Sequence, residues 1–178
     1  RDFCNYLRNI RYENGIVTYP TRLHYFSYWI EQNTLTGIVR EIVPQDSSVT
    51  EDSEYDIYYM SSNPEKYPAL RKDTSLIDDI AEMEKYFDGK TYRYIPKAKL
   101  KNPESLQAYI KDGDIIAIVT NKKGLDISHI GFAAWHKGNL HLLNASSIHK
   151  KVVEEPMSLY KYMMRHPSQT GIRIIRVL

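Results

Sequence analysis

Four short apolar segments between residue 114 and the C-terminus constrain the fold of this chain more than any other feature. They are rich in Ile, Val and Leu, and they read DIIAIVT (114–120), HIGFAAW (129–135), LHLLNA (140–145) and GIRIIRVL (171–178). Each has the length of a strand and not of a helix, and turn residues separate the second from the third. The pattern predicts an antiparallel sheet in the second half of the chain.

Most segments with helical periodicity come before this sheet. The clearest is 73–89, in which apolar residues recur at helical spacing up to Gly89, a residue type that commonly ends helices. Thr21 is expected to cap a second helix, whose Leu23, Phe26 and Ile30 share one face. Further expected elements are a helix over 1–12, helix starts at Asn63–Pro64 and Asn102–Pro103, a strand over 91–96, a surface loop over 41–56 and a helix around 156–164.

The order of these elements, helices first and strands afterwards, indicates the α+β class. The 178 residues fit one domain, with a helical part over 1–112 and a sheet over 113–178. Because the first residues already follow a helical pattern, we expect that the domain is N-terminally truncated in this chain. Cys4 lies on the same helical stripe as Leu7, and we predict that it is a packing residue.

The composition excludes several classes of protein. Hydrophobic residues make up 42% of the chain and charged residues 26%, as in an ordinary globular domain. The net charge of +2 arises from mixed signs, so we expect no nucleic-acid partner. No run approaches the roughly 20 apolar residues of a membrane span. A single cysteine excludes an internal disulfide framework, and fifteen tyrosines suit a groove that binds a sugar or peptide.

The segments 129–135 and 140–145 read as a hairpin that keeps two polar residues among apolar ones. If Trp135 pairs with Leu140, paired residue numbers sum to 275, and Gly131 then lies opposite Asn144. Since side chains alternate between the faces of a strand, this register puts four residues on one face: His129, Gly131, Asn144 and Ser146. Asn144 would reach His129 diagonally, because Gly131 has no side chain in between.

An imidazole held by an amide oxygen is suited to general-base catalysis. The oxygen accepts one ring N–H and selects one tautomer and one orientation, as in Cys-His-Asn sites. The alternative is that His129 is a strand-end histidine bonded to the backbone and that Asn144 is a polar residue near the turn. Four histidines lie within 21 residues, but without an HExxH motif or a cysteine pair we expect no metal site: His129, His136, His141 and His149.

The segment 113–147 resembles the catalytic sheet of the NlpC-type papain-like cell-wall hydrolases. In that superfamily a strand of small residues begins with the catalytic histidine and a glycine, and the next strand carries a third polar residue. His129, Gly131 and Asn144 stand at these positions. The segments 10–30, 60–70 and 170–177 narrow the resemblance to a branch formerly described as a domain of unknown function and similar to N-acetylmuramoyl-L-alanine amidases. The resemblance covers nearly the whole chain.

The resemblance implies a papain-like fold and a cysteine amidase. Its substrate would be the amide between N-acetylmuramic acid, typically the anhydro form, and L-Ala of the stem peptide in peptidoglycan fragments (muropeptides). The resemblance also implies no metal, no other cofactor and a periplasmic or extracytoplasmic location. The third polar position is often histidine in this family, whereas it is Asn144 here. The family's catalytic cysteine precedes the region where this chain starts, so Cys4 does not match it and this chain alone is expected to be inactive.

Two other functions stay open at this point, and five further residues are candidates for substrate binding. The chain could be a non-catalytic muropeptide-binding module, or a thiol hydrolase that uses Cys4. In the RLHYF segment, Arg22 could pair with a carboxylate and Tyr25 could stack on a sugar, although both could equally be ordinary surface residues. The residues expected to bind substrate are Arg22, His24, Tyr25, Ser128 and Ser146.

Overall fold

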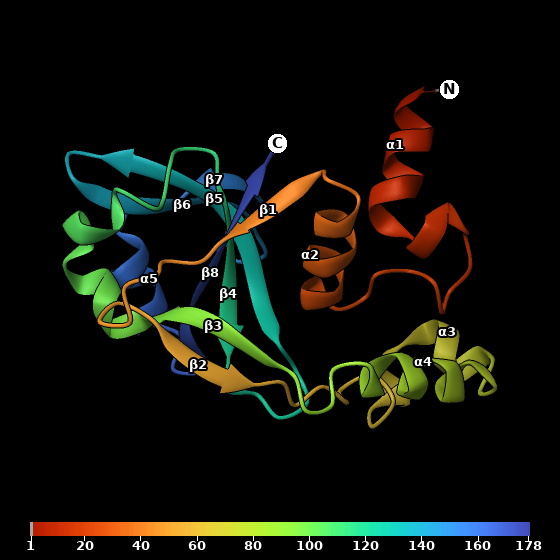
Figure 1. Cartoon of the computed structure of the whole chain (residues 1–178). Helices are drawn as coiled ribbons and strands as arrows, with labels where there is room; N and C mark the ends of the chain where they lie inside the picture. Colours follow the sequence, from red (N-terminus) through yellow and green to blue (C-terminus); the bar gives the residue numbers. More distant parts are fainter. Residues whose placement is uncertain (1) are drawn as a thin grey trace.

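A single antiparallel sheet forms the centre of the molecule (Figure 1). The structure is a computed structural model and describes residues 2–178. Within these residues eight strands pair, seven of them in the order β2-β3-β8-β4-β5-β6-β7, and β1 pairs with β8. Their bounds are β1 Val39–Ile42, β2 Glu51–Glu54, β3 Thr91–Pro96, β4 Ile115–Thr120, β5 Ile127–His136, β6 Asn139–Ser146, β7 Lys151–Glu154 and β8 Gln169–Val177.

Short helices surround this sheet. The α-helices are α1 Asp2–Arg11, α2 Phe26–Leu35, α3 Pro68–Lys72, α4 Leu76–Lys85 and α5 Leu159–Met164. Single 3-10 turns cover Glu13–Gly15, Pro64–Lys66, Lys97–Lys101 and Pro103–Leu106. A mixture of helices with an antiparallel sheet confirms the α+β class. The four strands predicted from the apolar segments are β4, β5, β6 and β8, and the strand predicted over 91–96 is β3.

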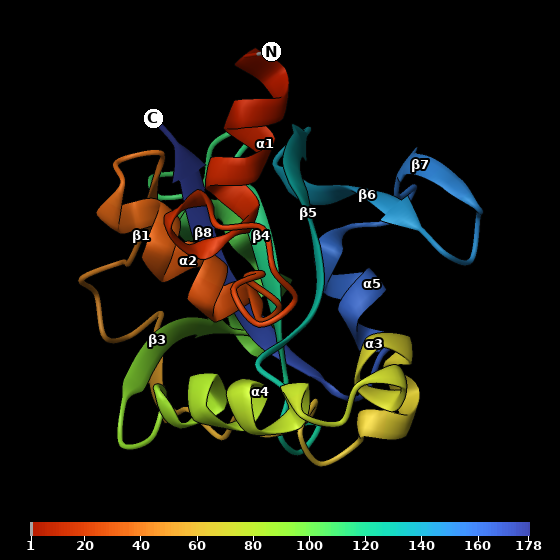
Figure 2. The same cartoon turned by 90° about the vertical axis from the view of Figure 1, so that its right-hand side faces the viewer.

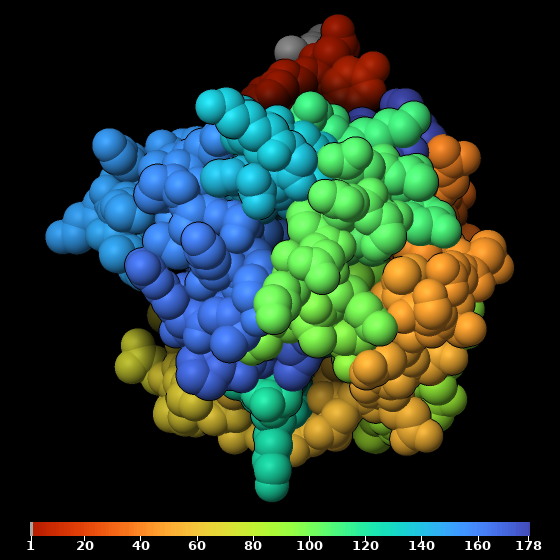
Figure 3. Space-filling model, turned by 90° about the vertical axis from the view of Figure 1, so that its left-hand side faces the viewer, coloured from red at the N-terminus to blue at the C-terminus, as the bar shows by residue number. Residues whose placement is uncertain are grey.

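The two faces of the sheet are covered by different helices, because side chains alternate along each strand. Ile116 and Ile118 of β4 lie on the face that packs beneath α5 and the turns over 97–106. Figure 3 shows α5 and these turns side by side over that face. Ala117 of β4 and Ile175 of β8 lie on the opposite face, where they pack against α2. A further apolar cluster joins α3, α4 and the segment before α2 beyond the edge of the sheet.

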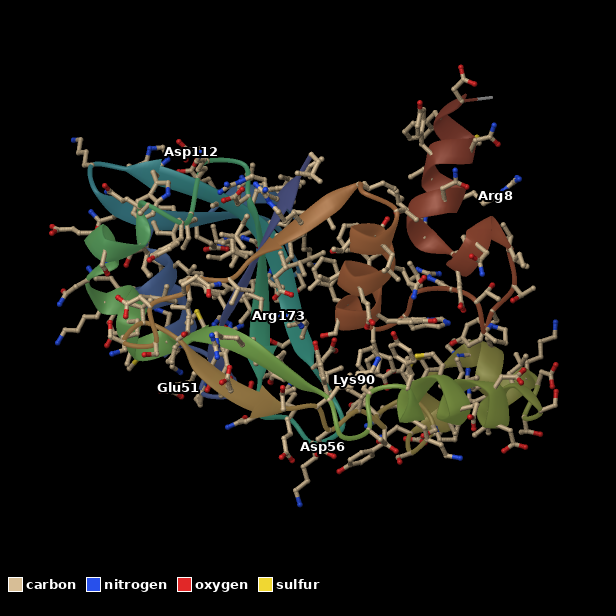
Figure 4. All side chains as sticks on the ribbon, in the orientation of Figure 1. Arg8, Glu51, Asp56, Lys90, Asp112 and Arg173 are labelled. Atoms are coloured by element: carbon tan, nitrogen blue, oxygen red, sulfur yellow. The ribbon has the colours of Figure 1, made fainter. Side chains whose placement is uncertain are left out.

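Arg173 of β8 ties α2, β1 and the central strand together. It lies between the sheet and α2 (Figure 4), and only 5% of it is exposed. Its Nε and Nη2 donate to the Glu41 carboxylate at 2.6 and 2.8 Å, and its Nη1 donates to Ser27 and to the Tyr55 oxygen. Burial on its own would lower the pKa of Arg173, but the hydrogen bonds and charge of Glu41 raise it on balance. An arginine that is paired with a carboxylate and makes four hydrogen bonds is therefore tolerated in this interior.

Three predicted helix starts and one predicted loop are wrong. Thr21 does not cap α2, which begins at Phe26 after an extended Tyr25, because Thr21 bonds instead to Thr18 in a compact loop. The starts at Asn63–Pro64 and Asn102–Pro103 are 3-10 turns and not α-helices. The segment predicted as a loop over 41–56 contains β2 and the end of β1. The β2 sequence EDSE carries no apolar alternation, and it pairs with β3 through the backbone and an Arg93–Asp52 ion pair of 2.7 Å.

The predicted packing role of Cys4 is also wrong. The helical segment expected over 1–12 is α1, apart from residue 1, which lies outside the described residues. No described residue of α1 is buried, and Cys4 is exposed. The helix meets the rest of the chain through its last turn, where the Ile10 carbonyl accepts from Asn33 and the Arg11 carbonyl accepts from the Leu23 N–H. Its N-terminal end projects from the body of the molecule in Figure 1, in agreement with the exposure of Cys4.

No helix within residues 2–178 has the length and apolar character needed to cross a membrane.

Candidate functional site

The turn between β5 and β6 sets which side chains meet at the site. Lys137 and Gly138 have φ angles of 50° and 80°, the conformation of a two-residue type I′ hairpin turn. Trp135 pairs with Leu140, as predicted, and the ladder runs back to Phe132 and Leu143. Beyond this pair β6 pairs with β7 and runs away from β5 (Figure 2). The predicted pairs of Gly131 with Asn144 and of His129 with Ser146 therefore lie outside the ladder.

Gly131 is the residue at which the two strands separate. A Cβ atom there would lie 2.7 Å from the Leu143 carbonyl oxygen and 2.7 Å from Leu142 Cδ1, so only glycine fits without a shift. Backbone therefore approaches backbone closely at this point, just before β6 turns away. This close approach keeps Asn144 within reach of a side chain two residues before Gly131.

His129 and Asn144 form a direct hydrogen bond. Their Nε2 and Oδ1 atoms are 2.9 Å apart, so the two side chains lie on one face of the sheet, as predicted. Because an amide oxygen only accepts, Nε2 carries the ring proton and Nδ1 keeps a free lone pair. Asn144 is 4% exposed, and its Nδ2 donates to Glu155 Oε1 at 3.1 Å. His129 itself is half-buried. The alternative of a histidine bonded only to backbone is not what the structure shows.

A small polar cavity of about 190 Å³ opens beside this pair. Tyr162 of α5 lies across it, with its ring centroid 6.4 Å from that of His129, and burial raises the pKa of Tyr162. Gln169 at the start of β8 is 5% exposed, and its Oε1 has no hydrogen-bond partner within residues 2–178. Such an acceptor is available to a donor on a bound molecule. The lining residues are Lys122, Ser128, His129, Asn144, Ser146, Ser147, Ile148, Tyr162, His166, Ser168 and Gln169.

Of the five residues predicted to bind substrate, the structure brings two to this cavity. Ser128 lines it and donates to the Ile118 carbonyl at 3.3 Å. Ser146 also lines it, and its Oγ accepts from the His149 N–H. The other three residues, Arg22, His24 and Tyr25, are not among the lining residues. That Ser128 and Ser146 contact substrate stays a prediction.

The RLHYF segment lies elsewhere and is largely structural. The Tyr25 side chain is buried, and its hydroxyl donates to Glu84 Oε1 at 2.6 Å. This position leaves no ring face open to a sugar, so the placement does not support the stacking role. His24 bonds to the Tyr19 carbonyl at 2.8 Å, and burial lowers the pKa of its imidazole. Arg22 is exposed and forms a backbone bridge with Tyr12.

The four clustered histidines do not share one set of contacts. His136 is 2.6 Å from Glu154, and Nδ1 of His141 is 3.0 Å from the Glu155 carbonyl oxygen. The rings of His136 and His141 lie together, with centroids 5.3 Å apart, whereas His129 faces the cavity. Within residues 2–178, no group of three His, Cys, Asp or Glu side chains is arranged to hold a metal ion.

Three residues of the site have no signal in the sequence that singles them out. Tyr162 lies on a short helix that the sequence did predict, but its direction depends on how α5 packs on the sheet. Gln169 reaches the cavity because β8 inserts beside β4. Glu155 follows β7, a strand that the sequence did not predict, and is 4% exposed. A glutamate within the VVEEP segment reads as a surface residue unless the fold is known.

Solved structures similar to this chain include proteins from Bacteroides and Legionella. A protein from Bacteroides fragilis, named provisionally as a xylanase, is 40% identical, with a TM-score of 0.91 over 99% of this chain and 75% of its own. An N-acetylmuramoyl-L-alanine amidase from Bacteroides uniformis is 37% identical, with a TM-score of 0.90 over 97% of this chain and 72% of its own. A Legionella pneumophila protein is 25% identical, with a TM-score of 0.64 over 97% and 67%. No curated protein matches the chain.

The family that matches this chain is described in the same terms as the Bacteroides uniformis amidase. The AmiA-like family, described as N-acetylmuramoyl-L-alanine amidase-like, matches residues 1–172. This match confirms the resemblance to amidases, while the placement in the NlpC-type superfamily stays a prediction. The match covers α1, the RLHYF segment and the cavity around His129 and Asn144 alike. The chain belongs to the AmiA-like family of N-acetylmuramoyl-L-alanine amidase-like proteins.

Proposed function

We propose that this chain supplies the general base and its positioning residue to a cysteine amidase. The enzyme would hydrolyse the amide between N-acetylmuramic acid, in its anhydro form, and L-Ala in peptidoglycan fragments. The observation that carries the proposal is the 2.9 Å bond between His129 Nε2 and Asn144 Oδ1, which leaves Nδ1 free as a base. The N-acetylmuramoyl-L-alanine amidase from Bacteroides uniformis supports the substrate class.

In the proposed reaction, Nδ1 of His129 takes the proton of a cysteine thiol, and the thiolate attacks the lactyl carbonyl of the muramyl group. The tetrahedral intermediate collapses to an acyl-enzyme as His129 gives its proton to the amine of L-Ala, which leaves with the peptide. Water then attacks the acyl-enzyme, again with His129 as base, and releases the sugar acid and the thiol. Asn144 holds the imidazole in the tautomer that both steps need.

We further propose a papain-like, NlpC-type fold, with the nucleophilic cysteine in chain that precedes this one in the full protein. A thiol must lie within hydrogen-bond reach of the imidazole to be activated. Among residues 2–178 the cavity around His129 is lined by no cysteine, and Cys4 lies exposed on α1. These observations favour a nucleophile outside the described residues over the alternative that uses Cys4. A cell-wall substrate would place the protein in the periplasm or outside the cytoplasm.

The name of the Bacteroides fragilis relative raises a glycosidase as a second candidate. Glycosidases generally use two carboxyl groups roughly 5 to 10 Å apart on either side of the bond that breaks. Within the described part of the chain, the cavity around His129 is lined by no Asp or Glu. The carboxylate of Glu155 does not line the cavity, and it is buried and bonded to Asn144. This site therefore favours acyl transfer over glycoside hydrolysis.

The test is hydrolysis of a purified anhydromuropeptide by a form of the protein that includes the preceding coding sequence. Release of the free stem peptide, followed by mass spectrometry, is the expected result. His129→Ala should abolish it, because the thiol then has no base, whereas His136→Ala, which alters an exposed histidine of the same strand, should retain the rate. Wild-type hydrolysis by the His129→Ala variant would show that the proposed mechanism is wrong.

A further inference from the structure

Glu155 is a buried carboxylate one contact beyond the His129–Asn144 pair. It directly follows β7, and only 4% of it is exposed. Its main chain makes two contacts with β6. Its N–H donates to the Leu142 carbonyl at 2.9 Å, and its own carbonyl oxygen lies 3.0 Å from His141 Nδ1. The position of Glu155 beside Asn144 is thus set by bonds to the main chain of Glu155 and not by its side chain.

The Glu155 carboxylate decides which way the Asn144 amide faces. An asparagine side chain has a donor end and an acceptor end of almost the same shape, and it can rotate between them. A carboxylate only accepts, so the end of Asn144 that lies 3.1 Å from Glu155 Oε1 must be the NH₂ group. The amide oxygen is then the end that faces His129 at 2.9 Å, and it accepts the proton on Nε2.

We propose that Glu155 is a positioning residue that sets the tautomer of His129 through Asn144. The carboxylate fixes the amide, the amide oxygen holds the proton on Nε2, and Nδ1 is left as the basic nitrogen. This inference deepens the proposed function, on which its catalytic meaning rests, since a base needs that free lone pair. The effect on the tautomer itself requires neither a nucleophile nor a substrate.

Two neighbouring groups also approach Asn144 or Glu155, and their interactions are weaker than the bond between these two residues. The Val153 carbonyl also accepts from Asn144 Nδ2, but at 3.4 Å, near the limit of a hydrogen bond. His149 Nε2 lies 3.8 Å from Glu155 Oε2, the oxygen that does not contact Asn144. A bond to a charged acceptor is stronger than one to a neutral carbonyl, so Glu155 dominates the orientation of the amide.

The experiment is ¹⁵N nuclear magnetic resonance of the histidine rings in this chain at about pH 8, where an unperturbed imidazole is neutral. Long-range couplings distinguish the Nε2–H tautomer from the Nδ1–H tautomer, and the chain has only six histidines to assign. The wild type should show His129 in the Nε2–H form. In Glu155→Leu the ratio of Nε2–H to Nδ1–H should fall about tenfold, because the free energy of a hydrogen bond to a charged group corresponds to a factor of about ten in an equilibrium.

Glu155→Gln is the second variant, and it keeps the shape of the side chain in case the leucine variant does not fold. Glutamine can accept from Asn144 or donate to it, so it removes the constraint on direction while keeping a hydrogen bond. Here the ratio should fall severalfold. The matched control is Glu154→Gln, which alters the exposed neighbour that contacts His136. It should move the His136 signals and leave those of His129 unchanged.

A wild-type tautomer ratio for His129 in the folded glutamine variant would overturn the inference, since the Val153 carbonyl would then suffice. The same holds for a folded leucine variant. Failure of the proposed function would give a different result. The form of the protein that includes the preceding coding sequence would not cleave muropeptides, while the tautomer shift in these variants would still occur.

Discussion

At the scale of single residues, the site depends on a chain of three polar groups that are bonded in one direction. Glu155 accepts from Asn144, and Asn144 accepts from His129. Both Glu155 and Asn144 are buried, whereas His129 is half-buried and faces the cavity. Buried polar groups that are fully bonded are rigid, because every alternative arrangement leaves a donor or acceptor unpaired.

The first prediction at this scale concerns Asn144. In the form of the protein that includes the preceding coding sequence, Asn144→Ala should lower kcat about 100-fold with little change in KM, since the base stays present but loses its orientation. Asn144→His should recover most of this loss, because an imidazole can also accept from Nε2 of His129. Asn121→Ala, an exposed asparagine that does not line the cavity, is the control. Steady-state kinetics with an anhydromuropeptide measure both constants. An Asn144→Ala enzyme with unchanged kcat would contradict the orienting role.

At the scale of elements, the β5–β6 hairpin determines the register that brings the pair together. Its two-residue turn is of the type whose twist matches that of the strands. Lys137 nevertheless occupies a position with φ of 50°, which a side chain with a Cβ adopts at a cost. The hairpin is therefore well defined in register but not optimal in its turn residues.

A stability prediction follows for this turn. Lys137→Asn should raise the free energy of unfolding by about 0.5 to 1 kcal/mol, because Asn-Gly is favoured where both turn residues have positive φ. The same change at Lys123, an exposed loop residue without positive φ, should have almost no effect. Urea denaturation followed by circular dichroism compares the two variants with the wild type. A destabilised Lys137→Asn protein would show that the lysine makes contacts that outweigh its backbone conformation.

At the scale of the whole molecule, the sheet is joined through strands far apart in the sequence. The last strand, β8, lies between β3 and β4 and also pairs with β1. A second apolar cluster beyond the sheet is closed around Tyr25, whose hydroxyl lies between Glu84 and the Met60 N–H. Burial, together with the hydrogen bond to Glu84, raises the pKa of Tyr25 above its ordinary value.

This shift predicts how global stability changes in alkali. An unfolded tyrosine ionises near pH 10, whereas folded Tyr25 stays protonated, so stability is fully present below about pH 10 and is lost as the pH rises above it. Tyr25→Phe removes one such group, and the slope of the unfolding free energy against pH should become shallower by up to about 1.4 kcal/mol per pH unit. Denaturation curves between about pH 9 and 11.5 measure the slope. Equal slopes in the two proteins would show that Tyr25 does not remain protonated in the folded state.

The sequence by itself determined the elements whose pairing partners are close along the chain. The β5–β6 register followed from the Lys137–Gly138 turn and the alternation of apolar residues, and this local geometry sufficed to predict that His129 and Asn144 share a face. The helix α4 was likewise predicted from its apolar spacing, although it ends at Lys85 and not at Gly89. In these segments a few neighbouring residues supply most of the information, since periodicity and turn conformation are local properties.

Only the tertiary structure decided the features that depend on distant contacts. The strands β2 (EDSE) and β7 (KVVE) show no alternation of apolar and polar residues, and they form because a neighbouring strand has free backbone groups with which they pair. Contacts with distant parts of the chain also decide the exposure of Cys4, the burial of Tyr25 and the approach of Glu155 to Asn144. Each depends on which parts of the chain pack against one another. The free energy of that packing is shared among residues that lie far apart in the sequence.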